Sequence, residues 1–252
     1  MNGLAPGEKI EDLFRHGLSI IQAEHLPKFG LEGVLLANFP AIRDNWQVCD
    51  LCTGSGIVPL LLATRAKNLK IAGIEVSPLL SRMARRSVEL NNLQGRIEII
   101  EADLLQHSLE KNKWDLVTVN PPYYRPDRGG VSPEYSRALA RSEVTAGLGD
   151  ILAAARDLLK NRGRLALTYR ISGLGEMLGA LEKLRFGVRR LRFVHHNIAS
   201  KAAFFLAECQ KGSETQIYVE PPLVIYETKE RLTPEMQGVY FAGKALESGL
   251  LL

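Results

Sequence analysis

Cysteine is scarce in this sequence, because the 252 residues contain only Cys49, Cys52 and Cys209. Three thiols are too few for a disulfide framework. Cys49 and Cys52 form a lone CxxC pair, which a redox centre or a zinc site could use, but no second CxxC and no nearby pair of histidines completes a metal site. We interpret the two as small residues where a strand turns into a loop, and we expect no metal.

Long apolar runs are missing as well. No segment reaches the roughly 18 apolar residues that a membrane helix needs, and acidic residues occur within the first dozen positions, unlike a signal peptide. We therefore expect a cytoplasmic protein with no membrane partner. Internal repeats and low-complexity segments are also absent, and with 24% charged and 46% hydrophobic residues the composition is that of a globular protein with one large core.

Strand and helix patterns alternate from residue 48 onward at the spacing of βαβ units. The pattern predicts strands at 47–51, 70–75, 96–100, 114–119 and 164–169, and helices at 57–66, 78–91, 149–160 and 175–184. Two late strands, at 190–195 and 203–209, are close enough to form an antiparallel hairpin at the sheet edge, and a last strand is expected at 223–227. Residues 1–45 are expected to form an N-terminal extension that packs on the core, and residues 46–252 one domain that includes the C-terminal tail.

The loop after the first of these strands is rich in small residues. It reads Asp50-Leu51-Cys52-Thr53-Gly54-Ser55-Gly56. Glycines let the backbone turn tightly and let a ligand approach bare amides. No Lys-Ser/Thr pair follows, as a phosphate-binding P-loop requires, and Pro59 stands where a dinucleotide site has its third glycine. The loop therefore favours a nucleoside ligand over a phosphate or NAD.

Acidic residues follow the next two predicted strands. Glu75 ends the second strand, where a carboxylate can accept both hydroxyls of a ribose. Asp103 follows the third strand, where it can accept from an adenine amino group with help from the backbone of Leu104. Ligands of open parallel sheets bind at the carboxyl ends of the strands, so these residues are expected to share a site with the glycine loop.

The fourth predicted strand ends in Asn120-Pro121-Pro122-Tyr123. An exocyclic aromatic amine is a poor nucleophile because its lone pair is delocalised into the ring. The side-chain carbonyl of Asn120 and the backbone carbonyl of Pro121 can each accept one N–H and thereby favour a localised lone pair. Pro122 keeps the loop rigid, and Tyr123 offers a ring on which a base can stack.

These four motifs, in this order and spacing, resemble the class I methyltransferases. The resemblance implies a Rossmann-like α/β fold with a seven-stranded, mostly parallel sheet, an antiparallel last strand and helices on both faces. It implies S-adenosylmethionine as the cofactor, bound by Asp50, Thr53, Gly54, Ser55, Gly56, Glu75, Asp103, Leu104 and Asn120. The last motif is similar to that of amino-methyltransferases, which implies a catalytic role for Asn120, Pro121, Pro122 and Tyr123. The departure is Cys52, where the family often has glycine.

Segments outside the core resemble one branch of that family, the bacterial tRNA(Val) adenine-N6 methyltransferases. They are residues 11–13, 17–22, 29–39, 140–144 and the tail around 222–234. The resemblance implies that the substrate is the adenine at position 37 of tRNA. Glu32 and Ser142 depart from it, since the branch usually has aspartate and histidine there, and this leaves the detailed substrate contacts open.

A polyanionic partner also agrees with the net charge of +4. Candidate phosphate contacts are Arg185, Arg189, Arg190, Arg192, His195, His196 and Lys201, together with Arg125, Arg128, Arg137 and Arg141 in a polar loop at 125–142. Methylation of a protein glutamine, of a guanine in ribosomal RNA or of an oxygen in a small molecule remain alternatives. A degenerate, non-catalytic RNA-binding module is disfavoured because the cofactor motifs are intact.

Overall fold

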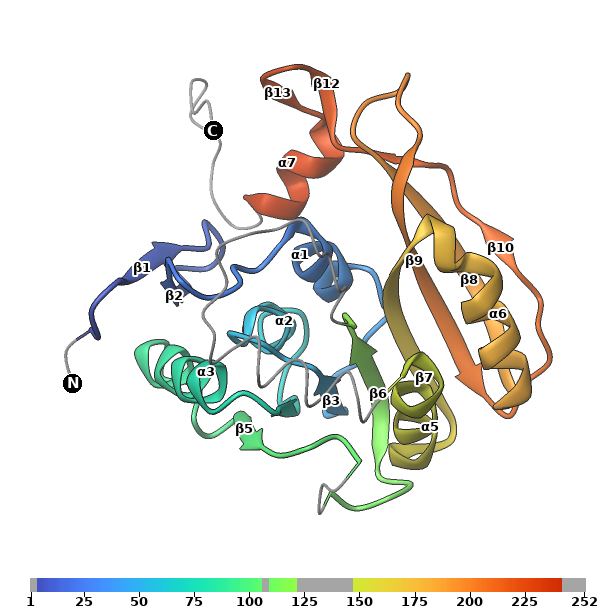
Figure 1. The fold of residues 1–252 in the computed structure, drawn as a ribbon, viewed down its shortest axis with the longest axis horizontal. Helices are drawn as coiled ribbons and strands as arrows, with labels where there is room; N and C mark the ends of the chain where they lie inside the picture. Colours follow the sequence, from blue (N-terminus) through green and yellow to red (C-terminus); the bar gives the residue numbers. More distant parts are fainter. Residues whose placement is uncertain (1–3, 106–108, 122–146, 242–252) are drawn as a thin grey trace.

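A computed structural model describes residues 4–105, 109–121 and 147–241 (Figure 1). Its centre is a nine-stranded sheet in the order β10-β8-β9-β7-β6-β3-β4-β5, with β11 also paired to β8. The strands of this sheet are β3 (Gln47–Leu51), β4 (Lys70–Glu75), β5 (Ile97–Glu101), β6 (Trp114–Val119), β7 (Leu159–Arg170), β8 (Phe186–His195), β9 (Ala202–Lys211), β10 (Tyr218–Val219) and β11 (Leu223–Val224).

Helices precede the sheet, lie between its strands and follow it in the sequence. They are α1 (Leu31–Asn38), α2 (Ile57–Leu62), α3 (Pro78–Leu90), α5 (Leu148–Leu158), the 3-10 turn η1 (Ile171–Gly173), α6 (Leu174–Lys183) and α7 (Pro234–Tyr240). The start of α3 shows how sequence sets a boundary: the side chain of Ser77 accepts a hydrogen bond from the backbone N–H of Leu80, and Pro78 occupies the first turn, where no N–H is needed.

The predicted strands 47–51, 70–75 and 114–119 begin and end as predicted, at β3, β4 and β6. Three other boundaries differ by four residues or more. Strand β8 begins at Phe186, four residues before its predicted start, and the strand predicted at 223–227 is two short strands, β11 and β12 (Tyr226–Thr228). Helix α2 ends at Leu62, four residues early. Strand β7 begins at Leu159, directly after α5, because its pairing with β6 contains an irregularity: Trp114 pairs with Leu159, whereas Leu116 already pairs with Arg164. The residues between them interrupt the regular register, so the sequence pattern detects only the regular part of the strand.

Seven of the strands, β3 to β9, form the expected sheet. Strands β5, β4, β3, β6 and β7 run parallel to one another, and β9, the last of the seven, is antiparallel to both β7 and β8. The late hairpin therefore forms as predicted, but β8 is not a free edge. The short strands β10 and β11 pair with it in parallel, which extends the predicted seven strands to nine.

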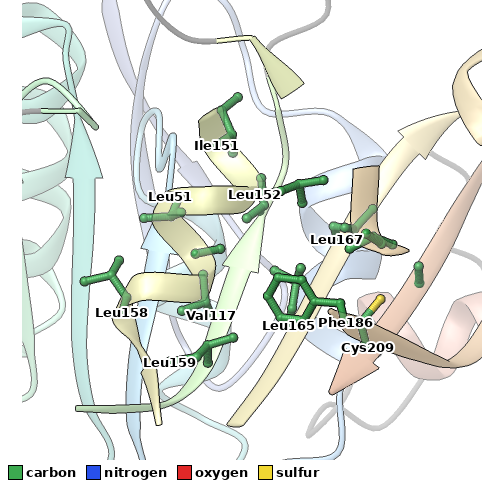
Figure 2. Packing of buried hydrophobic residues seen from close by; sticks show 14 of the residues in the cluster. Leu51, Val117, Ile151, Leu152, Leu158, Leu159, Leu165, Leu167, Phe186 and Cys209 are labelled. Atoms are coloured by element: carbon green, nitrogen blue, oxygen red, sulfur yellow. The ribbon is translucent and has the colours of Figure 1, made fainter. Parts of the chain in front are cut away.

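Helices cover both faces of the sheet, as expected (Figure 1). Side chains alternate between the faces along each strand: Cys49 and Val117 belong to the cluster under α5 and α6, whereas Val48 and Leu116 belong to the cluster with α1, α2 and α3. Figure 2 shows the first cluster, where Leu152 and Leu158 of α5 pack against side chains of β3, β6 and β7.

The segment before the sheet has structure of its own. An antiparallel hairpin of β1 (Glu8–Asp12) and β2 (Ser19–Ala23) precedes α1. Strand β2 lies along α3, since the Ser87 hydroxyl accepts the N–H of Ile21 at 3.0 Å and the Asn91 side-chain oxygen accepts that of Ser19 at 2.9 Å. Ile20 is fully buried in the cluster that contains α1, α2 and α3.

The chain after the sheet folds over one end of it. A small hairpin of β12 (Tyr226–Thr228) and β13 (Arg231–Leu232) leads into α7, whose Met236 is fully buried against Leu35 of α1 and Phe204 of β9. Among the described residues, no helix is both long enough and apolar enough to cross a membrane.

The packing around the antiparallel strand β9 can be tested at Phe205. It is fully buried on β9, with its ring centroid 6.5 Å from that of Tyr169 on β7 and 6.4 Å from that of Phe193 on β8. Phe205→Ala should lower the free energy of unfolding by about 3–5 kcal/mol, because it removes buried area and leaves a cavity. Urea unfolding measures the loss. Tyr218→Ala, at a side chain that is 63% exposed on β10, should change stability by at most about 0.5 kcal/mol; similar losses in both variants would contradict this packing.

Candidate active site

The strand registers bring the predicted site residues to one edge of the sheet. Leu51 pairs with Ile74 on one side and with Val119 on the other, so Cys52, Glu75 and Asn120 stand at the same level. Glu75 in turn pairs with Glu101, and the N–H of Ala102 donates to the carbonyl of Glu75 at 3.1 Å. The carboxyl ends of β3, β4, β5 and β6 therefore form a single rim, as the sequence predicts for a ligand site.

The loop after β3 is built on left-handed backbone. Cys52, Gly54 and Gly56 have φ of 58°, 58° and 89°. A Cβ on Gly56 would lie 3.2 Å from the Cβ of Ala84 on α3, whereas a Cβ on Gly54 would meet nothing within 4 Å. Gly56 is thus required for packing, and Gly54 leaves open space above the loop. The left-handed φ of Cys52 explains why glycine is common at this position, since L-residues rarely adopt it.

Asp50 anchors the loop from inside the sheet. Its side chain is 1% exposed and accepts two short hydrogen bonds, from the hydroxyl of Thr53 at 2.6 Å and from that of Thr118 on β6 at 2.6 Å. Burial raises the pKa of Asp50 to about 7, although the two hydroxyls lower it in part. Asp50 therefore holds the loop to β6.

Glu75 lies beneath the same loop. One carboxylate oxygen accepts the N–H of Gly54 and the other accepts the N–H of Ser77, both at 2.8 Å. Its side chain is 6% exposed, and burial raises its pKa. Each carboxylate oxygen has a second lone pair, so Glu75 can bind the backbone and still accept hydrogen bonds from a pair of ligand hydroxyls.

Asp103 and Leu104 follow β5 at the same rim. One oxygen of Asp103 accepts the N–H of Leu105 at 2.9 Å, which closes a turn and fixes the carboxylate. Leu104 is buried in the cluster under α5. The turn thus presents a carboxylate and a backbone segment just beyond the end of β5.

Asn120 is the first residue after β6. Its side-chain oxygen accepts a hydrogen bond from the hydroxyl of Thr168 on β7 at 2.8 Å. Pro121 follows and is buried. Pro122 and Tyr123, predicted to complete the motif, lie outside the described residues, and so do the arginines of the loop at 125–142.

Two functional positions escaped the sequence reasoning, Thr118 and Thr168. Both are fully buried, and each hydroxyl contacts a site residue, Asp50 or Asn120. A signal was present: each threonine is the polar member of a run of buried residues near the carboxyl end of its strand. Propensity alone gives such a threonine no special meaning, because β-branched residues are common in strands.

Two of the candidate phosphate contacts form ion pairs within the protein. Arg190 forms ion pairs with Glu208 at 3.1 Å and Glu220 at 3.2 Å, and Arg192 forms a bidentate pair with Glu235. The guanidinium groups of these two arginines are therefore already paired with glutamates of the fold, which leaves them less available to a phosphate.

The other members of that cluster lie at opposite ends of β8. Because β8 runs parallel to β7, Arg185 and Arg189 are near the edge away from Asn120, whereas His196 and Lys201 are near the same edge as Asn120. The ring of His196 lies 4.8 Å from that of Tyr226.

Comparison with known proteins places the fold in a family. The sequence profile of the methyltransferase small domain matches residues 32–173, more than half of the chain, and the match includes the glycine loop, Glu75, Asp103 and Asn120. The chain belongs to the methyltransferase small domain family. Its sheet, with the antiparallel last strand, is accordingly the Rossmann-like sheet of the class I methyltransferases.

Relatives within this family share one name. A Porphyromonas gingivalis protein named tRNA1(Val) (adenine(37)-N6)-methyltransferase is 33% identical over 148 residues, which are 56% of this chain and 57% of that protein. A Tolumonas auensis protein of the same name is 28% identical over 211 residues, 82% of this chain and 86% of that protein. The match to the first relative thus spans little more than half of its length.

Solved methyltransferase structures are also similar. A crystal structure from Agrobacterium tumefaciens, described as a predicted O-methyltransferase, has a TM-score of 0.68 and 25% identity, covering 83% of this chain and 95% of that chain. TYW2 of P. horikoshii in complex with MeSAdo has a TM-score of 0.57 at 14% identity, covering 83% of this chain and 73% of that chain. The second likeness shows the fold alone.

The two glycines of the loop should respond differently to a methyl group. Gly56→Ala should lower the free energy of unfolding by roughly 2–4 kcal/mol, because it combines a left-handed φ with crowding against Ala84. Gly54→Ala meets no neighbour and should cost only about 1 kcal/mol. Urea unfolding of both variants measures the difference; equal losses would show that Ala84 does not limit the space at Gly56.

Asp50 should make stability depend on pH. Burial raises its pKa from 3.8 to about 7, so between these values the folded protein keeps a proton that the unfolded chain has lost. Stability should therefore fall as the pH rises through this window and level off above it. Asp50→Asn cannot ionise and should remove the part of this fall that Asp50 causes, which is on the order of a few kcal/mol. The buried Glu75, whose pKa is also raised, should leave a residual fall in the same direction. Urea unfolding at about pH 5, 6, 7 and 8 compares the two proteins; parallel pH profiles would rule out the buried carboxyl as the cause.

Proposed function

We propose that this protein transfers a methyl group from S-adenosylmethionine to the N6 amine of an adenine in tRNA, at position 37 of tRNA(Val). The observation that carries the proposal is Asn120 and Pro121 at the carboxyl end of β6, level with the glycine loop and with Glu75. The names of the relatives support tRNA(Val) as the substrate. The proposal includes action in the cytoplasm, where tRNA is modified.

The described residues fit the methyl donor. The open space above Gly54 leaves its backbone accessible to a ligand. Each carboxylate oxygen of Glu75 accepts one backbone N–H and keeps a second lone pair, which can accept a ribose hydroxyl. Asp103 and the backbone at Leu104 would hold the adenine of the donor, and Thr53, Ser55 and Gly56 shape the loop. When bound, S-adenosylmethionine supplies an activated methyl group on a sulfonium.

Asn120 and Pro121 supply the amine-binding half of the site. The side-chain oxygen of Asn120 and the carbonyl of Pro121 each accept one N–H of the substrate amine and so keep its lone pair directed at the methyl group. This arrangement needs no strong base, because the nitrogen can lose its proton after the transfer. Tyr123, with Pro122 before it, would stack on an adenine turned out of its RNA, as base-modifying enzymes handle their targets.

The domain division supports this function. We propose that residues 1–45 form an extension that packs on the core formed by residues 46–252. Leu13, Ile20 and Val34 lie in the same buried cluster as Val48 and Ile57. The extension thus lies beside α2, which begins at the glycine loop, and α3, which begins just after Glu75.

A second candidate is an O-methyltransferase, because the similar Agrobacterium tumefaciens structure is described as one. Methylation of a hydroxyl calls for a metal or for a positioned histidine or lysine as base. The described residues at the ends of β3 to β6 offer carboxylates and an amide, whereas His196 and Lys201 follow β8, at the other side of β7 and β9. Among the described residues no cluster of histidine, cysteine and acidic side chains could hold a metal ion. These observations favour a nitrogen acceptor.

The experiment is methyl transfer from labelled S-adenosylmethionine to tRNA that lacks its own modifications, followed by nucleoside analysis. N6-methyladenosine in tRNA(Val) alone is the expected product. If ribosomal RNA or a protein glutamine is labelled and tRNA is not, the enzyme methylates an amine or amide of that other substrate. Label in an oxygen of a small molecule would establish the second candidate.

Two variants separate the halves of the site. Asn120→Ala should lower kcat by about a hundredfold or more and leave the Kd for S-adenosylmethionine within about twofold, because Asn120 contacts the acceptor amine. Glu75→Ala should instead weaken cofactor binding by at least about tenfold. Glu98→Ala, an exposed glutamate on the neighbouring strand β5, is the matched control and should change neither quantity. Equal loss of cofactor binding in the Asn120 and Glu75 variants would refute the division of roles.

A further inference from the structure

Thr168 has no assigned role, yet it touches the residue on which the chemistry depends. Its side chain is fully buried on β7, and its hydroxyl donates a hydrogen bond to the side-chain oxygen of Asn120 at 2.8 Å. Val119 pairs with Leu167, so Asn120 and Thr168 stand side by side on neighbouring parallel strands. The contact is therefore fixed by the register of the sheet rather than by a flexible loop.

The orientation of the Asn120 amide decides what it can do. A carboxamide has an oxygen that accepts hydrogen bonds at one end and an NH₂ that donates them at the other. An amine substrate that must be bound through its N–H groups needs the oxygen, and an amide turned over would present two donors to it. Rotation of the last side-chain torsion of asparagine is soft, so a neighbour has to choose between the two orientations.

We propose that Thr168 is a positioning residue that sets this orientation. By donating to one lone pair of the Asn120 oxygen, it holds that oxygen near β7 and leaves the second lone pair for the substrate amine. The inference rests on the proposed function, since it assigns to Thr168 the task of making Asn120 ready for an amine. Because the hydroxyl is already held in place by the sheet, no free energy is needed to reorient it during the reaction.

The surroundings of Thr168 make the bond effective. On its other side β7 pairs with β9, where Thr168 is opposite Leu206, which is 1% exposed. Strand β7 is thus paired on both sides, and the threonine backbone cannot move away from Asn120 without breaking the sheet. A hydrogen bond in such a water-poor setting is stronger than one at the surface.

The test compares three variants. Thr168→Val keeps the shape of the side chain and removes the hydroxyl, and it should lower kcat for tRNA methylation by about tenfold to a hundredfold, with KM and the cofactor Kd within about twofold. Thr168→Ser keeps the hydroxyl and should retain activity within about threefold of the wild type. Thr64→Val removes a hydroxyl that donates to the carbonyl of Leu61 at the far end of α2, and it should leave kcat unchanged.

A double variant distinguishes positioning from a structural effect. If Thr168 acts through Asn120, Thr168→Val should have no further effect on the residual activity of Asn120→Ala. Full activity of folded Thr168→Val, or losses that multiply in the double variant, would overturn the proposal.

A spectroscopic measurement keeps this test separate from the proposed function. In protein labelled with ¹⁵N at asparagine, the side-chain amide signal that disappears in Asn120→Ala should shift in Thr168→Val and stay in place in Thr168→Ser. An unchanged signal in Thr168→Val would overturn the role of Thr168 whatever the substrate is. Wild-type protein that methylates no tRNA would refute the proposed function instead, and the signal would still decide whether Thr168 orients Asn120.

Discussion

The common register of the parallel strands is the constraint on which the site depends. Because β3 is paired with β4 and with β6, and β6 with β7, four chain segments reach the same level and turn away from the sheet together. Asp50 secures this arrangement across two strands, since its buried carboxyl binds Thr53 in the loop and Thr118 on β6. A shift of one residue in the pairing of β3 with β4 would move Glu75 away from the glycine loop. The same shift in the pairing of β3 with β6 would move Asn120 away from the loop and from Glu75.

The burial of carboxyl groups near this rim costs free energy, which hydrogen bonds within the protein offset. Burial raises the pKa of Asp50 and Glu75, which means that the ionised forms are less stable here than in water. Each carboxyl is compensated by two short hydrogen bonds, from hydroxyls for Asp50 and from backbone N–H groups for Glu75. The compensation uses donors of the protein itself, so the loop is formed before any ligand binds and a ligand need not organise it.

Much of the fold could be predicted from the chain alone. The periods of apolar residues gave β3, β4 and β6 with their exact ends, because buried parallel strands are short apolar runs bounded by small or polar residues. The same pattern missed β1, β2, β10 and β13, and it predicted β11 and β12 as one strand at 223–227. Strands β10 and β11 depend on β8, a pairing partner more than 20 residues earlier in the sequence, and a two-residue strand has no periodicity to detect.

For the site, spacing alone indicated which residue types belong together. Glycines after a first strand, an acid after the second and an asparagine after the fourth are local signals, and they converge because parallel strands end at one edge. Local signals could not reveal that Arg190 and Arg192 are bound to glutamates 18 to 43 residues away, nor that Thr168 meets Asn120 across 48 positions. Such contacts depend on which side chains the folded sheet places opposite one another. The residue types that the site needs could therefore be predicted from the sequence. Their ion-pair partners, their orientations and the hydrogen bonds that hold them were decided only by tertiary packing.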